Sequence, residues 1–341
     1  MSIHGVIYAI YLKHYFCNNM RKILYVGYRD NNHSIVGGYD HIIDNPFSDS
    51  LMGEELLFGN IPVNKRGKFL NILVLDLHTR LIRFKYEVTH IFYGDTLLFP
   101  YSKRANHKIV ATIHMSLEMP RKNQNLFFRA LKSLDGIVVL SSNQKKILLE
   151  RYGINSVFIP HGFNSPRFIK QKTTIDKKFI NIVVLGQNYR DYDCLIESLN
   201  YCQEHCPNIR FHFIGQPKWF KEKASQYQNA IVYSRLKDDE YFSVIDDCDY
   251  NFLPVTFATA NNALLEAQFL GIVSILPVIE GIEDYSAPSP LNKFYNNREE
   301  LYNLFSSIEK TDKSPLIIDF CKRFKWDNVY SQLNEFYNSL F

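Results

Sequence analysis

The chain has 341 residues, of which 46% are hydrophobic and 22% are charged, and its formal net charge is +4. This length predicts two globular domains, and the composition excludes a disordered, collagen-like or coiled-coil protein. Six cysteines at irregular positions do not form a secreted disulfide framework and favour a reducing, cytoplasmic compartment.

Charge is divided unevenly along the chain. Residues 1–168 carry 21 Lys and Arg against 12 Asp and Glu, whereas residues 169–341 carry 18 against 23. This asymmetry predicts two domains with different partners, although an uneven solvated surface would also produce it. Nucleic acid is not expected as a partner, because the basic residues are spread out and accompany no nucleic-acid-binding motif. No run of about 18 apolar residues occurs, so no membrane-spanning helix is expected.

The first half of the chain alternates between two patterns. Residues 1–19 are largely apolar but lack the basic start and cleavage site of a signal peptide, so we expect an N-terminal arm or extension. Strands are then predicted at 21–27, 88–93, 108–114, 136–141 and 156–160, and helices at 125–134 and 142–153. Residues 68–86 fit either pattern, and their length favours a helix.

The segment 161–178 interrupts this alternation, because it combines Gly and Pro with a polar run that has no periodicity. It is therefore predicted to be a linker. Strands follow at 179–186, 209–215, 230–236, 249–255 and 272–278, with helices near 191–204, 217–227, 238–248 and 261–271. A last helix is expected at roughly 326–340.

Continuous apolar strands separated by amphipathic helices predict an α/β fold with two Rossmann-like, doubly wound parallel sheets. We expect an N-terminal domain at 20–165, a C-terminal domain at 166–320 and, at 321–341, a helix that packs back on the N-terminal domain. Such sheets bind ligands in the crevice at the carboxyl ends of their strands. Residues that directly follow strands are therefore the candidates for chemistry.

Three candidates come from the N-terminal domain. Gly37 and Gly38 follow the first strand, and a glycine pair allows the backbone to approach a phosphate or a sugar; a simple turn is the alternative. His114 ends the strand KIVATIH, where its ring could donate a hydrogen bond to a sugar. A structural histidine is the alternative there.

The C-terminal domain begins with a strand that ends at Gly186 and is followed by Arg190. The planar guanidinium of Arg190 is suited to binding a diphosphate. A surface ion pair with Asp191 or Asp193 is the alternative.

The most informative segment is FLPVTFATANNALLEAQFLGIVSILPV, at 252–278. A strand leads through small residues into a helix that starts near Asn261 or Asn262, so its free amides and the positive end of its dipole predict an anion site. One turn later, the carboxylate of Glu266 could accept hydrogen bonds from two adjacent hydroxyls, such as those of a ribose.

Two segments resemble the retaining GT-B glycosyltransferases of the large bacterial family 4, also called group 1. SSNQKKILLERYGINSVFIPHGFNSPRF, at 141–168, is similar to the end of that family's N-terminal domain, and ALLEAQFLGIVSILPV to its nucleotide-binding helix and strand. The order of elements matches over roughly residues 21–340. The resemblance implies a GT-B fold, in which two Rossmann-like domains face a central cleft.

The resemblance also implies roles for individual residues. Glu266 would hold the ribose, the amides from Asn262 to Leu264 would bind the diphosphate, and Arg190 would neutralise the leaving group. His114 would lie near the donor sugar. The other residues expected at the donor are Gly37, Gly38, Gly186, Gln187, Tyr233, Arg235, Leu236, Asn261 and Ala263.

Two positions depart from the family pattern. Ala258 stands where the family usually has a second Glu, eight residues before Glu266, and Gln187 stands where it usually has Arg. Loss of that Glu removes a group that orients the donor sugar, so the identity of the donor is open. The same departures motivate an alternative reading, a non-catalytic GT-B module that acts as a glycan-binding or partner subunit. A sugar-nucleotide epimerase is a third, less favoured reading.

Other residue clusters compete as metal ligands. Asp247 and Asp249, and likewise Asp191 and Asp193, form Asp-x-Asp patterns that hold a divalent ion in another transferase fold. The first pair precedes a strand, at the wrong end of the sheet, and the second begins a helix, where carboxylates are favoured anyway. Cys202, His205 and Cys206 lack a second ligand pair. No metal site is therefore expected.

The sequence thus predicts a metal-independent transferase that moves a sugar from a nucleotide diphosphate sugar to a glycan or lipid-linked acceptor. A UDP-sugar is favoured, a GDP-sugar is the alternative, and no bound cofactor is expected. The basic N-terminal domain predicts a further partner, the inner leaflet of a membrane, on which a cytoplasmic protein would bind peripherally. The basic residues expected to contact its headgroups are Arg80, Arg83 and Lys85, or Lys103, Arg104 and Lys108.

Overall fold

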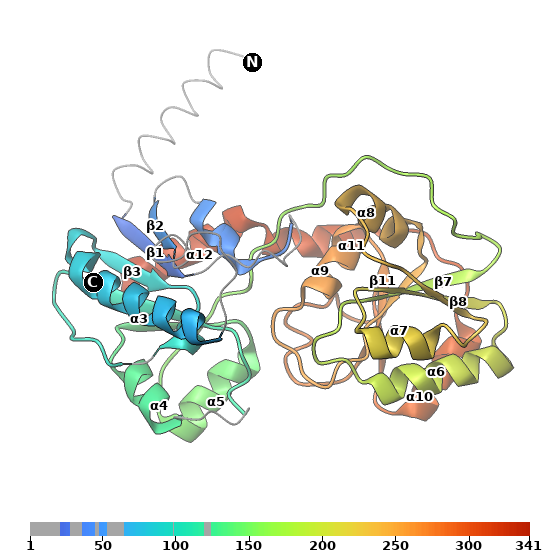
Figure 1. The fold of residues 1–341 in the computed structure, drawn as a ribbon, viewed down its shortest axis with the longest axis horizontal. Coiled ribbons are helices and arrows are strands. Elements are labelled where there is room, and N and C mark those ends of the chain that lie inside the picture. Colours follow the sequence, from blue (N-terminus) through green and yellow to red (C-terminus); the bar gives the residue numbers. More distant parts are fainter. Residues whose placement is uncertain (1–20, 28–35, 45–47, 53–64, 98, 119–123) are drawn as a thin grey trace, which may run out of the picture.

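The computed structural model describes residues 21–27, 36–44, 48–52, 65–97, 99–118 and 124–341. The chain forms two lobes that are joined by the segment 161–178 and by the C-terminal helices (Figure 1). The N-terminal arm expected at 1–19 lies outside the described residues.

The N-terminal domain contains a six-stranded sheet with the order β2-β1-β3-β4-β5-β6, in which every pairing is parallel. Its strands are β1 (Ile23–Gly27), β2 (Ser48–Met52), β3 (Val88–Ile91), β4 (Lys108–Ile113), β5 (Gly136–Val139) and β6 (Val157–Phe158). Its helices are α3 (Lys65–Ile82), α4 (Gln124–Lys132) and α5 (Ser142–Tyr152), with 3-10 turns η1 (Tyr39–Asp44), η2 (Arg83–Lys85) and η3 (Gly94–Thr96). The residues of β1 and β3 are all buried, as expected for a sheet that is covered on both faces.

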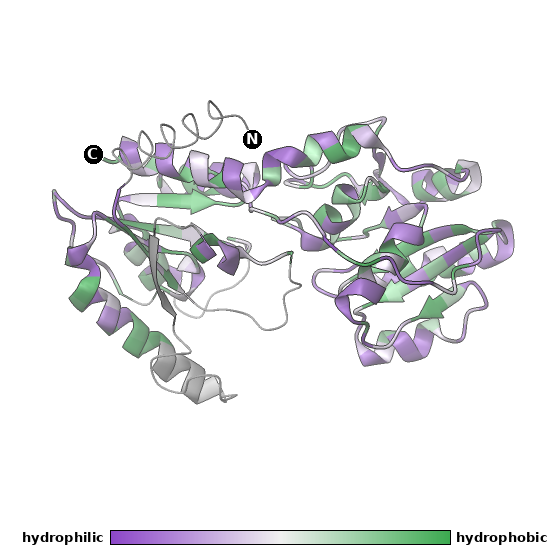
Figure 2. Cartoon of the chain, turned by 90° about the horizontal axis from the view of Figure 1, so that it is seen from above, coloured by the Kyte–Doolittle hydropathy of each residue, from purple (hydrophilic) through white to green (hydrophobic). Residues whose placement is uncertain are grey.

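The C-terminal domain contains a second six-stranded parallel sheet, with the order β12-β11-β10-β7-β8-β9. Its strands are β7 (Ile180–Leu185), β8 (Ile209–Ile214), β9 (Ala230–Val232), β10 (Tyr250–Phe252), β11 (Val273–Pro277) and β12 (Lys293–Tyr295). The helices that cover it are α6 (Tyr192–His205), α7 (Lys218–Ala224), α8 (Asp238–Asp247), α9 (Asn262–Phe269), α10 (Arg298–Ser307) and α11 (Pro315–Cys321). Figure 2 shows that the strands of this sheet are mostly hydrophobic, whereas its helices carry both hydrophilic and hydrophobic residues. The predicted pair of doubly wound sheets is confirmed.

The segment 68–86, which was ambiguous in the sequence, is mostly helical, because residues 65–82 form α3 as predicted from its length. Several other elements differ from the sequence-based expectations. Strand β9 ends at Val232, four residues before the predicted end, because the chain leaves the sheet before it enters α8. The sequence did not predict β2, β12, α10 or α11. The last of these begins with a side-chain cap at Ser314 and a proline at its first position, a signal of a helix start.

The last helix, α12 (Trp326–Ser339), packs on the N-terminal sheet rather than on the domain that precedes it (Figure 1). Its buried side chains, including Val329 and Leu333, share a hydrophobic cluster with residues of β1 and β4. Inside this cluster, Nδ1 of His90 lies 2.6 Å from the Tyr337 hydroxyl, and its Nε2 lies 2.7 Å from Oγ1 of Thr112. Both ring nitrogens are therefore hydrogen-bonded, which offsets the cost of burying the ring.

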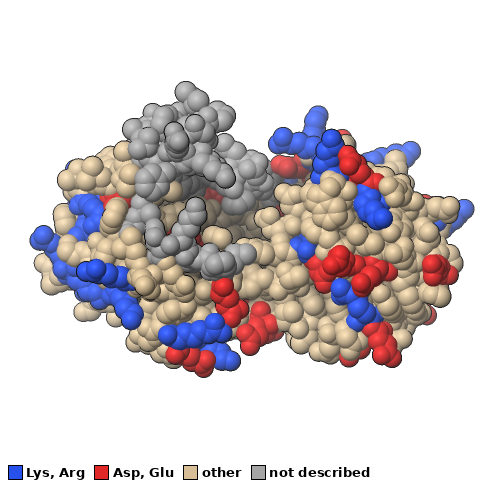
Figure 3. Space-filling model, turned by 60° about the horizontal axis from the view of Figure 1, so that its bottom comes forward, with Lys and Arg blue, Asp and Glu red and all other residues tan. Residues whose placement is uncertain are grey.

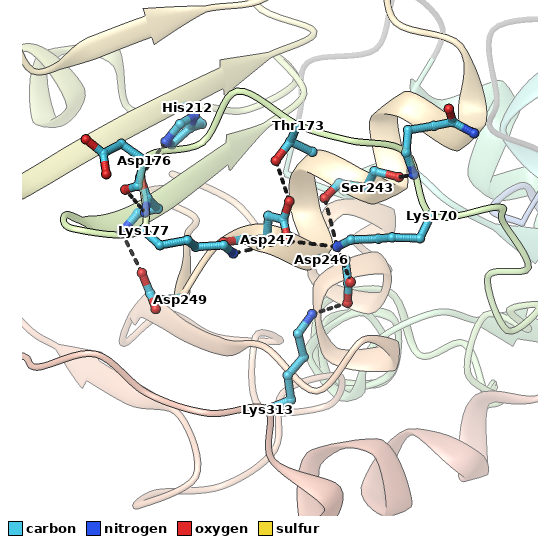
Figure 4. A network of polar contacts seen from close by, with 12 residues as sticks. Lys170, Thr173, Asp176, Lys177, His212, Ser243, Asp246, Asp247, Asp249 and Lys313 are labelled. Atoms are coloured by element: carbon cyan, nitrogen blue, oxygen red, sulfur yellow. Dashed lines mark hydrogen bonds and ion pairs between the residues drawn. The ribbon is translucent and has the colours of Figure 1, made fainter.

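The segment 161–178 is irregular, yet polar contacts fix it to the C-terminal domain (Figure 4). Lys170 forms ion pairs with Asp246 and with Asp247, the latter at 2.8 Å, and Lys177 lies 3.1 Å from Asp247. Burial disfavours ionisation of Asp247, but hydrogen bonds from Lys170, Thr173 and Lys177 outweigh it and lower the pKa of this carboxyl to about 2. The linker is thus part of the C-terminal domain from Lys170 onward.

Candidate functional site

A cavity of about 650 Å³ lies in the C-terminal domain, at the carboxyl ends of its strands. Its walls come from the loop after β7, the loop between β9 and α8, the loop between β10 and α9, and the first turns of α8 and α9. This is the position at which doubly wound sheets bind ligands. The cavity is large enough for a small organic molecule.

The loop after β7 is held in an unusual conformation. Gly186 has a φ of 68°, and Tyr189 has a φ of 56°, which a bulky residue rarely adopts. Arg190 fixes this loop, because its Nε donates to the carbonyl of Leu185 at 3.0 Å and its Nη1 to the carbonyl of Asn188 at 2.7 Å. Burial lowers the pKa of Arg190 to about 10, so the guanidinium stays charged at neutral pH. Arg190 therefore places positive charge in the wall of the cavity while it shapes the loop.

Helix α9 points its N-terminus at the cavity. Its cap is Asn261, whose side chain accepts a hydrogen bond from the amide of Leu264 at 3.3 Å. The amides of Asn262 and Ala263 belong to the first turn, so they have no acceptor within the helix, and both residues line the cavity. Because the Leu264 amide already bonds to Asn261 and its side chain is buried, only Asn262 and Ala263 remain as the candidate anion site.

Glu266 lies one turn into the same helix and lines the cavity with only 5% of its surface exposed. The hydroxyl of Tyr241, on α8, donates a hydrogen bond to Oε2 of Glu266 at 2.5 Å. Burial and the charge of Glu266 raise the pKa of Tyr241 well above its ordinary value, so this hydroxyl keeps its proton. The contact fixes the orientation of the Glu266 carboxylate in the wall of the cavity.

The loop between β9 and α8 contributes a third wall. Ser234, Arg235 and Leu236 all line the cavity. Tyr233 points elsewhere, because its hydroxyl lies 3.0 Å from Nδ1 of His212 and its ring packs against the hydrophobic core. The sequence predicts the position of this loop but not the direction of each side chain.

Two N-terminal candidates have different positions relative to the cavity. Gly37, which precedes Gly38 and η1, faces Asn262 across the domain boundary. His114 does not line the cavity; its ring contacts Tyr39 at a centroid distance of 4.7 Å and Tyr93 at 4.8 Å. The glycine loop thus meets the candidate anion site, whereas the His114 ring is enclosed by aromatic residues of its own domain.

The competing acidic pairs have structural partners. Asp247 forms ion pairs with Lys170 and Lys177 of the linker. Oδ2 of Asp249 accepts a hydrogen bond from the backbone amide of Asn181 at 2.7 Å. Asp191 caps α6 and forms an ion pair with Arg298 at 3.0 Å. Within the described ranges, no three His, Cys, Asp or Glu side chains lie close enough together to hold a metal ion.

Sequence reasoning missed several residues of the cavity. They include Asn188, Tyr189, Lys221, Asp238, Tyr241 and Phe257. Asp238 and Tyr241 share one face of α8 at i, i+3 spacing, a signal that could have grouped them. Lys221 comes from α7, and nothing in its local sequence distinguishes it from the other lysines of that helix.

Part of the N-terminal domain matches a known family. Residues 41–167 match the family model described as Glycosyltransferase Family 4. No curated protein sequence matches the chain.

Solved structures share the fold over nearly the whole chain. The lipopolysaccharide outer core galactosyltransferase WaaB, in its apo form, is 14% identical with a TM-score of 0.66, and the alignment covers 94% of this chain and 100% of that one. Anabaena HepE in complex with UDP is 13% identical with a TM-score of 0.66, and the alignment covers 93% of this chain and 100% of that one. The catalytic domain of starch synthase IV from Arabidopsis thaliana, bound to ADP and acarbose, is 10% identical with a TM-score of 0.66. The alignment covers 94% of this chain and 99% of that one. The expected resemblance to family 4 glycosyltransferases and the GT-B fold are thereby confirmed.

Proposed function

We propose that the chain is a retaining, metal-independent glycosyltransferase that moves a sugar from a nucleoside diphosphate sugar to a glycan or lipid-linked acceptor. One observation carries this proposal: the Glu266 carboxylate and the free amides of Asn262 and Ala263 face the same cavity at the carboxyl ends of a doubly wound sheet. Glu266 would accept hydrogen bonds from the ribose hydroxyls, and the two amides would bind the diphosphate.

Catalysis would be mainly electrostatic. Negative charge grows on the departing diphosphate as its bond to the sugar breaks, and donors that already point at that position stabilise the charge without reorganising. The amides and dipole of α9 supply this stabilisation, and the buried charge of Arg190 adds to it. Retention of anomeric configuration follows the family resemblance. Gly37, across the domain boundary, would bring the acceptor domain against the same site.

We further propose that the N-terminal domain binds its acceptor at the surface of an inner leaflet, as a cytoplasmic, peripheral protein. Figure 3 shows Lys and Arg side chains gathered at the outer end of this lobe. Arg80 forms an ion pair with Asp76 at 2.7 Å, and Arg83 is buried, so the exposed cations Lys85, Lys103 and Arg104 would contact the headgroups. No helix in the described part of the chain is long and apolar enough to cross a membrane.

The decisive experiment is calorimetry of the whole chain with UDP, GDP and their sugars, followed by donor hydrolysis assays in the presence of a chelator. We expect micromolar binding of a nucleotide that Glu266→Ala abolishes, and hydrolysis that the chelator leaves unchanged. Glu299→Ala, which removes a carboxylate outside the cavity, is the matched control. Absence of binding to any nucleotide would instead support the non-catalytic GT-B module, which the replacements at Ala258 and Gln187 motivate.

A further inference from the structure

The first turn of α8 also lines the cavity. Tyr241 contacts Glu266, and Asp238 lies one helical turn before Tyr241 on the same face of the helix. Arg235 precedes the helix, and Asp238 and Arg235 both line the cavity. One wall of the cavity thus carries the candidate anion site and the Glu266 carboxylate on α9, and the charged residues Asp238 and Arg235 lie at and just before the start of α8. A nucleotide has three parts to be bound, phosphate, ribose and base, and the charged pair is the group left over for the base.

Asp238 and Arg235 are both exposed, and both line the cavity. Neither side chain makes a hydrogen bond or an ion pair with any residue that the structure describes. Other charged residues of this domain do pair, for example Arg298 with Asp191 and Glu197. Two opposite charges that line a cavity without meeting each other offer a ligand both an acceptor and a donor.

We propose that this end of the cavity binds guanine, so that the donor is a GDP-sugar; the inference rests on the proposed function. Guanine presents two adjacent donors, N1–H and the 2-amino group, to which the two oxygens of the Asp238 carboxylate are matched. Its acceptors O6 and N7 are the atoms that an arginine binds with two parallel hydrogen bonds. Arg235 supplies that group, and Lys221 adds a second cation to the same cavity.

The other common bases fit this pair less well. Uracil has a single donor, N3–H, between two carbonyl oxygens, and a carboxylate facing that edge would be repelled by both oxygens. Adenine offers one donor group, its 6-amino group, so the second oxygen of Asp238 would lack a partner. The sequence favoured UDP, but the side chains at this wall favour GDP.

The test is calorimetry of the full chain with GDP, UDP and ADP as probes. We expect GDP to bind at least tenfold more tightly than UDP or ADP. Asp238→Asn should weaken GDP binding at least tenfold and change UDP binding less than threefold, because an amide replaces one of the two acceptors with a donor. Glu222→Gln, which removes a carboxylate from the neighbouring helix α7 outside the cavity, should change neither affinity.

The fold of the Asp238 variant can be verified by thermal unfolding, since the side chain of Glu240 still accepts the Lys237 amide and caps α8. Tighter binding of UDP or ADP than of GDP would overturn the guanine assignment and leave the proposed function intact. A GDP preference that survives Asp238→Asn would overturn the role of this residue. Failure of all three nucleotides to bind would count against the proposed function itself.

Discussion

Gly37 of the N-terminal domain faces Asn262 at the start of α9, so closely that a methyl group on Gly37 would lie 3.0 Å from Cγ and Nδ2 of the Asn262 side chain. This contact joins the glycine loop of one domain to the candidate anion site of the other. Any ligand bound to the amides of Asn262 and Ala263 therefore lies next to the backbone of the opposite domain. Glycine allows this close approach, because a larger residue would force its neighbours to move by a few tenths of an ångström.

Gly37→Ala tests this contact. The added methyl group would also meet the Phe163 ring at 3.1 Å, so either the loop or the Asn262 and Phe163 side chains must shift by a few tenths of an ångström. We expect the transfer rate, measured as kcat/KM in a radiolabelled-donor assay, to fall about tenfold or more, with a modest loss of stability of about 1 kcal/mol. The double variant Gly37→Ala/Asn262→Ala removes one of the two obstructing side chains and should recover part of the activity. An unchanged kcat/KM in the single variant would argue against a role for this contact.

Tyr241→Phe tests the orientation of Glu266. The variant removes the hydrogen bond that the Tyr241 hydroxyl donates to the buried carboxylate. Loss of a bond to a charged group costs about 1.5–3 kcal/mol of folding stability. Because the carboxylate is then free to rotate, we also expect nucleotide affinity to fall roughly tenfold in calorimetry. Tyr192→Phe, which loses only a 3.2 Å bond to the Gln187 carbonyl, serves as the control. Equal effects of the two variants would contradict a specific role for Tyr241.

The sequence predicted the sheets better than the site. Continuous apolar strands such as β7 were recognisable because both faces of a parallel sheet are buried. Strand β12, with three residues, is too short to show any periodicity. For the site, the end of a strand predicts the edge of the sheet at which a residue lies, but not where its side chain points. His114 and Tyr233 both follow strands, and neither lines the cavity.

Residues of the cavity that lie on helices were harder still to predict. Tyr241 reaches Glu266 only because α8 and α9 lie next to each other in space, and no local pattern encodes that proximity. Asn262 and Glu266, in contrast, belong to a single helix whose cap residue and spacing are visible in the sequence. The roles predicted for these residues stay predictions until a ligand is bound.

Acid should destabilise the protein through His90. Burial, and to a smaller extent the charge of His114, lowers the pKa of His90 to about 3. In the unfolded chain the ring titrates near pH 6.5, so between about pH 6.5 and 3 the unfolded state binds a proton that the native state does not. Stability should therefore fall as the pH falls, by up to about 1.4 kcal/mol per pH unit from this group.

The measurement is urea unfolding at pH 7, 6 and 5. In His90→Gln, unfolding should take up about one proton fewer, so the free energy of unfolding should fall less steeply as the pH falls; the substitution also lowers stability at every pH. His205→Gln, at an exposed position, should leave the dependence of the unfolding free energy on pH unchanged. The same pH dependence in wild type and His90→Gln would mean that His90 is not the source of the acid sensitivity.

Asp247→Asn should loosen the linker. The variant weakens the contacts with Lys170 and Lys177, and because these lysines are exposed we expect a loss of about 1 kcal/mol at pH 7. The pKa of Asp247 lies below its ordinary value, so its stabilisation is present above about pH 4 and is lost as the pH falls toward 2. The difference between wild type and variant should therefore shrink at pH 2.5. Asp312→Asn, at an exposed site, provides the control for a lost surface charge.

Gly162→Ala tests the point at which the linker crosses α12. A methyl group on Gly162 would lie between 2.2 and 2.5 Å from atoms of the Trp326 ring, which is 6% exposed and therefore has little room to move. Overpacking of this kind costs about 1–3 kcal/mol, and the two domains should also be held less firmly together because Trp326 begins the helix that returns to the N-terminal domain. The double variant Gly162→Ala/Trp326→Leu removes the ring, so its loss of stability should be smaller than the sum of the two single losses, as measured by urea unfolding. Additive losses would mean that the two residues do not constrain each other.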